Sequence, residues 1–327
     1  MNKRSLLRMS LGMLILASPG LSSGAAAQQW PQRGVTIITP FSPGVSPDVA
    51  ARILAEGLSK RWRQSVVVEN RPGADTMIGT KAFIDRGDPH TLLFTTHATF
   101  TVVPLLYANV PFDPVKDVSP ISLAVEDFLG IVAAPDLPAS SLPEFIELAR
   151  AKPGKLNFFA VPGVPHLAYL ALQKRTGIDT TFVAYANPGA AVSDMTEGRI
   201  HVAVLPLAMV LGQVRAGKLK LLAVTNAERA PAAPTAPTVV EAGQPAMAFG
   251  GLLGMFGSKD MPAALRERIA ADLAAVLAEP DTVRRLQEVG LIARGSTPAQ
   301  FAAALDVQRA KWSAVARENN ISPQQPR

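Results

Sequence analysis

A chain of 327 residues, of which 48% are hydrophobic and 18% charged, can bury a large core and exceeds what one small domain holds. Cysteine is absent, which excludes disulfide bonds, a thiolate nucleophile and cysteine-ligated metals. The formal net charge is +6, but the basic residues are scattered and do not alternate with aromatic ones, so we expect no nucleic-acid partner.

The first residues predict a secretory signal peptide. Three basic residues come first, a short apolar run follows, and Ala25–Ala27 supply the small residues that a signal peptidase reads. The apolar run is too short to span the roughly 30 Å of bilayer hydrocarbon, which argues against a membrane anchor. We therefore expect residues 1–27 to be cleaved off near Ala27 and the mature chain to be periplasmic.

In chain order, the mature sequence alternates between strand and helix patterns. Val35–Thr39 is apolar or β-branched throughout and predicts a strand, and Pro40–Pro47 is rich in turn residues. A helix is expected next, with Ser46 as its N-cap, Pro47 as its first residue and Asp48 in its first turn. A carboxylate would then lie near the positive end of that helix.

The same alternation continues through the middle of the chain. Further strands are predicted at residues 66–68, 91–96, 131–133, 156–159, 182–184, 202–205 and 219–224, with helices at 78–84, 142–151, 166–175, 189–196 and 207–216. Such alternation predicts mostly parallel sheets with helices on both faces. The fold class is therefore α/β.

Residues 225–248 break this pattern. Their centre, residues 230–237, consists of proline, alanine and one threonine and must be loop. A disordered linker is one interpretation. An ordered surface excursion fits better, because a strand pattern resumes at Leu252–Phe256.

The last third of the sequence is helical. An amphipathic helix is predicted over residues 262–277, with Asp260 as its cap, and a second over 280–289. A final helix is expected to start at Thr297-Pro298. Its Trp312 is expected to pack in the core rather than to contact a ligand.

The sequence contains no standard enzyme motif. A G-x-S-x-G elbow, a P-loop, a G-x-G-x-x-G after the first strand and H-E-x-x-H are all missing, and no two of the four histidines have i, i+4 spacing. Ser46, His97 and Asp48 could be written as a nucleophilic triad, but Ser46 and Asp48 are better explained as helix-end residues. We expect no catalysis, no cofactor and no metal site.

The loops after the strands are the expected ligand site. In open α/β sheets ligands bind beyond the carboxyl ends of the strands. There the first loop meets a helix N-terminus, whose free N–H groups and dipole favour an anion. Residues 95–99, 161–166 and 185–189 have matching post-strand positions. They would face one another if two lobes clamp a ligand.

Several stretches resemble a known family, the solute receptors of tripartite tricarboxylate transporters, often called Bug receptors. Pro40-Phe41 and Gly44 to Asp48 are similar to its P-F-x-x-G-G-x-x-D motif, and Val67–Ala74 with Ile78-Gly79 to its V-V-E-N-R-P-G-A-x-x-x-I-G motif. Further matches follow in order at residues 91–93, 104–107, 112–114, 152–157, 166–168, 222–225, 237–243 and 311–312. The resemblance covers essentially the whole mature chain.

The resemblance implies a type II periplasmic binding protein with two lobes, each a mostly parallel sheet flanked by helices. Lobe I would comprise residues 28–123 and 249–327, and lobe II residues 124–248. The two crossings near 121–126 and 248–253 would form a hinge. A monomer of this family holds a small organic acid between the lobes, by backbone N–H groups, hydroxyls and waters, and delivers it to a membrane transporter.

The same resemblance and the post-strand loops give the candidate ligand-binding residues. They are Phe41, Ser42, Gly44, Val45, Ser46, Asp48, Thr96, His97, Thr99, Val161, Gly163, His166, Tyr185, Asn187, Gly189 and Leu205. Several depart from the family pattern, because Val45 replaces a glycine and Leu205-Pro206 replaces a polar pair. These changes remove donors or add bulk, which predicts a monocarboxylate with an apolar or aromatic body.

Two other functions stay open on the sequence. One is a ligand-sensing partner of a membrane signalling protein, because the family also allows receptors without an adjacent transporter. The other is an α/β hydrolase-like enzyme that uses His97 as its base.

Overall fold

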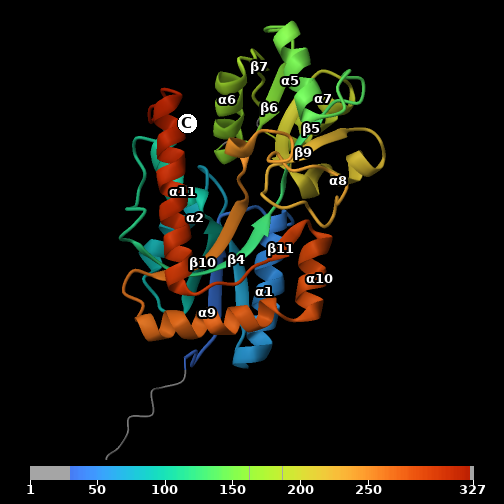
Figure 1. The fold of residues 1–327 in the computed structure, drawn as a ribbon. Helices are drawn as coiled ribbons and strands as arrows, with labels where there is room; N and C mark the ends of the chain where they lie inside the picture. Colours follow the sequence, from blue (N-terminus) through green and yellow to red (C-terminus); the bar gives the residue numbers. More distant parts are fainter. Residues whose placement is uncertain (1–29, 162, 186, 325–327) are drawn as a thin grey trace, which may run out of the picture.

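The computed structural model describes residues 30–161, 163–185 and 187–324, which form two helix-covered sheets placed one above the other (Figure 1). The predicted signal peptide, residues 1–27, and its cleavage point near Ala27 lie outside the described residues. The predicted α/β class is confirmed.

The larger sheet has six strands in the order β11-β4-β10-β3-β1-β2. They are β1 (Val35–Thr39), β2 (Val66–Asn70), β3 (Thr91–Thr96), β4 (Val118–Asp127), β10 (Gly251–Ser258) and β11 (Leu291–Ala293). The smaller sheet has five strands in the order β7-β6-β8-β5-β9. They are β5 (Leu129–Ala133), β6 (Asn157–Ala160), β7 (Thr181–Phe182), β8 (Val202–Pro206) and β9 (Lys220–Val224). The chain thus leaves the larger sheet after β4 and returns to it in β10.

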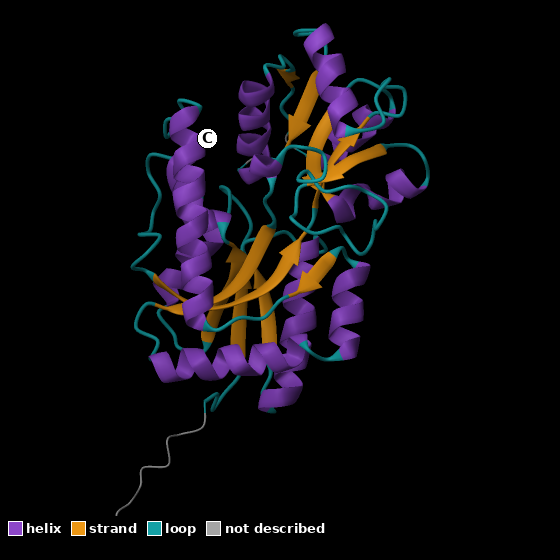
Figure 2. Ribbon diagram, viewed as in Figure 1, coloured by secondary structure: helices purple, strands orange, loops and turns teal. Residues whose placement is uncertain are grey.

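Helices cover both sheets (Figure 2). The larger sheet carries α1 (Ser46–Trp62), α2 (Met77–Arg86), α3 (Ala98–Thr101), α4 (Val103–Leu106), α9 (Ala263–Leu277), α10 (Pro280–Glu288) and α11 (Pro298–Glu318). The smaller sheet carries α5 (Leu142–Ala151), α6 (Val164–Thr176), α7 (Pro188–Thr196) and α8 (Leu207–Arg215), and a short turn η1 (Pro245–Met247) precedes β10. Within the described residues, none of these helices has the length and apolar character of a membrane span.

Both sheets are mixed, which corrects the expectation of mostly parallel strands. In the larger sheet β1 pairs parallel with β2 and β3, whereas β10 runs antiparallel to β3 and β4, and β11 antiparallel to β4. In the smaller sheet β6 pairs parallel with β7 and β8, whereas β5 runs antiparallel to β8 and β9. The reversed pairings involve the strands at the crossings, because β4 leaves the larger sheet and β10 re-enters it.

The larger sheet separates two hydrophobic clusters, because successive side chains of a strand point to opposite faces. Ile37 and Leu92 belong to the cluster under α1 and α9, whereas Ile38 and Leu93 pack with Phe301 of α11. All five side chains are buried. Strands buried on both faces appear in the sequence as continuous apolar runs, and the bounds of β1 and β3 were predicted correctly for this reason.

The smaller sheet is built in the same way. Ile131 and Phe158 lie in the cluster that α5 and α6 cover, and Val132 and Phe159 lie in the cluster that α7 and α8 cover. The rings of Phe158 and Tyr169 of α6 stack with centroids 4.1 Å apart. Each sheet therefore has a core on both of its faces.

Helix α1 begins one residue earlier than predicted. Val45 is the N-cap and Ser46 is already helical, so the prediction of Ser46 as N-cap is wrong. The reason is the Asp48 carboxylate, which reaches back from the third helical position and accepts the Gly44 N–H at 2.8 Å. Asp48 thus fixes the chain just before the helix, whereas a capping serine would accept an N–H of the first turn.

Other ends and elements also differ from the sequence prediction. Pro262, in an extended conformation, is the N-cap of α9, so Asp260 is not its cap. Strand β4 was missed, because Pro120 and polar residues interrupt its apolar pattern. Strand β11, with three residues, is too short to show any periodicity. In contrast, Thr297 forms the capping box that starts α11, as expected.

The two chain crossings between the sheets lie side by side. The first passes from β4 to β5 through Phe128, and the second reaches β10 through Phe249. The Thr225 N–H donates to the Leu129 carbonyl at 2.9 Å, and the Phe249 N–H donates to the Thr225 carbonyl at 2.8 Å. Since β4 also pairs with β10, one hydrogen-bonded band holds both crossings.

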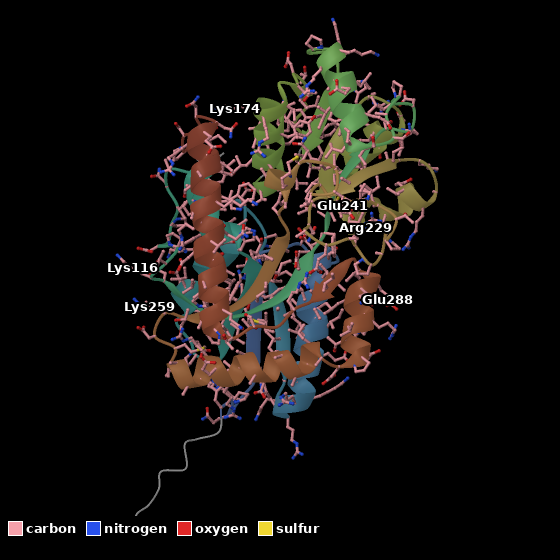
Figure 3. The ribbon with its side chains drawn as sticks, in the orientation of Figure 1. Lys116, Lys174, Arg229, Glu241, Lys259 and Glu288 are labelled. Atoms are coloured by element: carbon pink, nitrogen blue, oxygen red, sulfur yellow. The ribbon has the colours of Figure 1, made fainter. Side chains whose placement is uncertain are left out.

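Helix α11 makes a third link between the layers. It extends beside α6 of the smaller sheet, where the labelled Lys174 lies near its end and donates to the Glu318 carbonyl (Figure 3). Trp312 is buried and contacts Phe249 edge to face, with centroids 5.7 Å apart. The expectation that Trp312 is a packing residue is confirmed.

The segment from residue 225 to 248 is an ordered excursion, as expected. Ala230 and Val239 are buried against the smaller sheet. The Arg229 Nε donates to both carboxylate oxygens of Glu241 at 3.0 Å, and Figure 3 shows the two side chains together on the surface. Buried alanines let this proline-rich stretch lie close to the sheet.

We predict that Gly57→Ala destabilises the protein, because its Cβ would lie 2.3 Å from Val276 Cγ1 where α1 packs on α9. Overpacking of this kind costs about 1–3 kcal/mol. Gly212→Ala in α8 is the matched control, because nothing lies within 4 Å of its Cβ and helix propensity alone should stabilise it. Urea unfolding of both variants measures the difference, and an equal gain from both would contradict close packing of α1 on α9.

Candidate ligand-binding site

The loop between β1 and α1 is held in shape by the carboxylate of Asp48. Its Oδ2 accepts from the Gly44 N–H at 2.8 Å and the Arg52 Nε at 3.1 Å, and its Oδ1 accepts from the Asn70 Nδ2 at 2.7 Å. Asn70 also donates to the Phe41 carbonyl at 3.0 Å. Both ends of the loop are therefore fixed to one buried acid.

Burial by itself would raise the pKa of Asp48, but the hydrogen bonds from Arg52, Asn70 and Gly44 outweigh it and hold that pKa below its ordinary value. The carboxylate is thus ionised and only 1% exposed. The hydrogen bonds to the Asp48 carboxylate come from other groups of the protein. Asp48 shapes the predicted site, while Ser42 and Val45 of the same loop remain exposed.

The loop between β2 and α2 has an unusual backbone. Ala74, Asp75 and Thr76 have φ values of 45°, 46° and 77°, in the left-handed region that residues with a Cβ rarely adopt. Side chains hold this conformation, because the Tyr107 hydroxyl donates to the Asp75 carboxylate and the Thr76 hydroxyl pairs with Thr99. Strain of this kind tends to occur at functional sites.

A row of threonine hydroxyls joins this loop to the end of β3. Thr99 Oγ1 lies 2.8 Å from Thr76 Oγ1 and 2.9 Å from Thr95 Oγ1. Thr99 is fully buried, so its hydroxyl connects two loops and is not on the surface. Thr96 is partly exposed, and its hydroxyl accepts the Ala98 N–H at 3.4 Å.

His97 is buried, with 1% exposure, under the second crossing. Burial and the Lys311 ammonium lower the pKa of His97 to about 4, against the opposing effect of a hydrogen bond to the Gly250 backbone. Its Nδ1 lies 3.0 Å from Thr101 Oγ1. The imidazole is therefore neutral, and its partner is Thr101 rather than Asp48, so the residues of the hypothetical triad do not form one.

In the smaller sheet, the loop after β6 leads into α6. Gly163 is the N-cap of α6 and has φ 90°, a conformation open to glycine. His166 in the first turn stacks on Phe182 of β7, with ring centroids 4.3 Å apart. Burial lowers the pKa of His166, so its imidazole behaves as part of an aromatic cluster.

The loop before α7 contains the other predicted residues of this layer. The Asn187 side chain accepts the Gly189 N–H at 2.8 Å and caps α7, and both residues are exposed. The Tyr185 hydroxyl donates to Asp194, and burial together with that carboxylate raises the pKa of Tyr185 to about 12. Tyr185 is thus a neutral phenol whose proton is engaged by Asp194.

Two predicted residues differ sharply in exposure. Val161 is half-buried at the end of β6. Leu205 is fully buried in the cluster of the smaller sheet that also holds Phe128 and Phe159. The Leu205 side chain therefore serves the core of the sheet.

Sequence reasoning missed several residues that form these loops. Arg52 and Asn70 complete the Asp48 network, and Asp75 and Thr76 shape the second loop. The i, i+4 spacing of Asp48 and Arg52 on one helix was a usable signal. Nothing in the sequence indicates that Asn70 reaches Asp48, because that contact depends on how β2 lies beside α1.

The post-strand loops offer mainly backbone donors and few charges. The first N–H groups of α1 and α6 have no partner within their own helix, and the helix dipoles favour anions there, whereas the Gly189 and Ala190 N–H groups of α7 are bonded to Asn187. Each helix also carries a proline in its first two positions, Pro47, Pro165 or Pro188, which removes one donor. Such an arrangement can bind a small anion without a paired arginine or lysine.

The family model of the tripartite tricarboxylate transporter family receptor matches residues 50–321. This chain belongs to that family. BugT of Bordetella pertussis (strain Tohama I) is 30% identical over 309 residues, which are 93% of this chain and 95% of BugT.

Solved structures agree with this assignment. The periplasmic binding protein BugD is 27% identical, with a TM-score of 0.77 over 90% of this chain and all of BugD. R. palustris Rpa4515, solved with adipate, is 28% identical, with a TM-score of 0.81 over 90% of this chain and all of that protein. The receptor family, the two-lobed α/β fold and the resemblance to Bug proteins are thereby confirmed.

We predict that Asp48→Asn lowers the free energy of unfolding of this receptor by about 2 kcal/mol at pH 7, because the charge-assisted bonds to Arg52 and Gly44 are lost. A carboxylate with a lowered pKa stabilises the fold above its ordinary pKa of 3.8, and this contribution disappears as pH falls through the folded value. The difference from wild type should therefore shrink at pH 3.

Urea unfolding at pH 7 and pH 3 measures this effect. Asp85→Asn on the exposed surface is the matched control, and its cost should stay below about 0.5 kcal/mol at both values. An equal loss at both pH values for Asp48→Asn would show that the charge contributes nothing.

We predict that Ala74→Gly stabilises the receptor by up to about 1 kcal/mol, because glycine adopts φ 45° without steric cost. Ala271→Gly, at an exposed site within α9, is the opposite control and should cost about 1 kcal/mol. Thermal and urea unfolding compare the two. Destabilisation by both substitutions would mean that Ala74 is not strained.

Proposed function

We propose that this receptor captures a small organic carboxylate between its two lobes in the periplasm and delivers it to a tripartite tricarboxylate-type membrane transporter. The observation that carries this proposal is the pair of post-strand loops at the N-termini of α1 and α6, which present backbone donors at the positive ends of two helices. Its relatives include a periplasmic binding protein and a structure solved with adipate.

The proposed lobes are residues 28–123 with 249–327, and residues 124–248. What supports this division is that the strands of the smaller sheet all lie within 124–248. Both crossings occur next to each other, at the ends of β4 and β10. We propose that they act as the hinge, and that the receptor works as a monomer without a cofactor.

The proposed ligand has one carboxylate and an apolar or aromatic body. Three prolines remove donors from the helix ends, as described above. Two apolar side chains near the loops of the larger sheet, Val45 and Ile78, are 40% and 52% exposed. These features suit a ligand whose second end needs no hydrogen bonds.

We propose that the receptor performs no catalysis. This is supported by the membership of a receptor family and by the state of His97, which is buried, neutral and paired with Thr101. Among the described residues, Ser46 has no hydrogen bond to His97 or Asp48.

We predict that hexanoate and benzoate shift the thermal unfolding of the receptor more than adipate and citrate do. A ligand at about 100 times its dissociation constant stabilises by about 2.7 kcal/mol, which differential scanning fluorimetry detects easily. Hexanoate and adipate have the same chain length and differ by one carboxylate, so this pair tests the preference directly. Strong shifts with citrate and adipate alone would contradict a monocarboxylate.

A pair of variants separates site effects from stability. Thr96→Val removes a partly exposed hydroxyl at the end of β3, and calorimetric affinity for the best ligand should fall about tenfold, equivalent to roughly 1.4 kcal/mol. Thr181→Val in β7 removes an exposed hydroxyl outside the loops and should leave affinity unchanged. No shift with any carboxylate would overturn the proposed function.

A further inference from the structure

Asp127 lies at the point where the first crossing leaves the larger sheet. It is the last residue of β4, with Gly251 of β10 on one side and Leu291 of β11 on the other. One residue later the chain is already entering the smaller sheet. The backbone around Asp127 is therefore part of the connection between the two layers.

The Asp127 side chain packs over the second crossing. A Cβ atom added to Gly251 would lie 1.7 Å from Asp127 Oδ1, so the carboxyl fills the space above this glycine. Oδ1 is inaccessible to solvent and has no hydrogen-bond partner among the described residues. The carboxyl group lies between the two crossing chains, and its Oδ1 lacks a hydrogen-bond donor.

The charged groups around Asp127 do not neutralise a negative charge there. Neighbouring Glu126 carries the same sign and accepts from Asn226 Nδ2 at 2.7 Å. Arg294, at the end of β11, lies 2.7 Å from Glu126 Oε2 and 3.5 Å from Glu228 Oε2, so its charge is shared by those two acids. Gly251 and Leu291, the partners from β10 and β11, are not titratable.

A second buried hydrogen-bond acceptor lies beside Asp127. Asn226 Nδ2 donates to the Asp127 carbonyl at 2.9 Å, while Asn226 Oδ1 has no partner among the described residues. Two unpartnered acceptors at one crossing call for a donor. A neutral carboxylic acid has an O–H donor, whereas an ionised carboxylate places negative charge on the inaccessible, unpartnered Oδ1.

Burial and the Glu126 carboxylate raise the pKa of Asp127 to about 7, although the Gly251 N–H acts in the opposite direction. The geometry and the charges therefore agree on an acid that is mostly neutral below about pH 7 when the crossing is packed.

We propose that neutral Asp127 is a positioning residue that locks the two crossing chains, and that its ionisation loosens the crossing and weakens ligand capture. This proposal rests on the proposed function, in which the crossings form the hinge of a closing receptor. The ligand is not touched by Asp127. Its effect reaches the site through β10, whose Leu252 carbonyl accepts the His97 N–H at 2.8 Å and whose Leu253 pairs with Thr96 at the end of β3.

The direction of the pH effect follows from linkage. A carboxyl group whose pKa is raised on folding contributes stability below its ordinary pKa of 3.8, and this stability is lost progressively between that value and the folded pKa, here about 7. If opening of the lobes hydrates Asp127, the same holds for closure. Affinity should then fall as pH rises toward 7 and stay constant above it, with a total loss of about tenfold for each unit by which closure raises the pKa.

The experiment compares wild type with Asp127→Asn, whose amide mimics the neutral acid. Hexanoate and adipate are titrated calorimetrically from pH 5.5 to 8.5, and hydrogen-exchange protection of residues 126–129 and 249–251 is measured over the same range without ligand. Wild type should lose affinity and protection between pH 5.5 and pH 7 and stay constant above pH 7, whereas Asp127→Asn should show no such pH dependence and bind at least as tightly as wild type at pH 5.5. Asp306→Asn, at an exposed site in α11, is the control and should behave as wild type.

A second variant keeps the proposal testable if Asp127→Asn does not fold. Glu126→Gln removes the neighbouring negative charge, so the pH midpoint of wild-type protection should move to lower pH. Parallel pH profiles for wild type and Asp127→Asn, or an unchanged midpoint in Glu126→Gln, would overturn the proposal. Absence of binding by both carboxylates would overturn only the proposed function, because the exchange measurement still reports on the crossing.

Discussion

The antiparallel pairing of β4 with β10 is the constraint on which the structure depends. Both strands belong to the larger sheet, β4 continues through Phe128 into β5 of the smaller sheet, and β10 is reached from β9 through residues 225–250. Their ladder therefore serves as core structure and as the joint between two layers. Both mixed sheets follow from it, because one strand must leave while the other returns. Asp127 and Gly251 face each other at the end of this ladder, with the Asp127 carboxyl group over the glycine.

The candidate site uses its charged residues for structure rather than for direct contact. Asp48 is ionised and buried, and it fixes the first loop through Gly44, Arg52 and Asn70. In the first loop, the exposed groups include backbone, Ser42, Val45 and the half-exposed Arg52 guanidinium. We propose that such a site recognises an anion by oriented backbone dipoles, which avoids the desolvation of a second buried charge. Changes of ligand within the family can then arise from uncharged positions such as Val45.

How much of the site the sequence predicted depends on how far apart in the chain the interacting residues lie. Loop positions after β1, β3 and β6 were predicted correctly, because strand and helix patterns are local. The burial and the contacts of individual side chains were not predicted. His97 lies under the second crossing, His166 stacks on Phe182, and Leu205 faces the core of the smaller sheet. Each outcome depends on residues far away in the chain, which no spacing in a single sequence encodes.

The sequence by itself determined the α/β class, the bounds of β1 and β3, and the start of α11 at Thr297, because these depend on side-chain periodicity and capping within a few residues. Membership of the receptor family was also visible in its ordered motifs. Only the tertiary structure decided strand direction, the roles of Asp48 and Asp127, and the strained turn at Ala74. These features arise where segments distant in sequence compete for the same buried space, and burial sets both the backbone conformation and the charge state there.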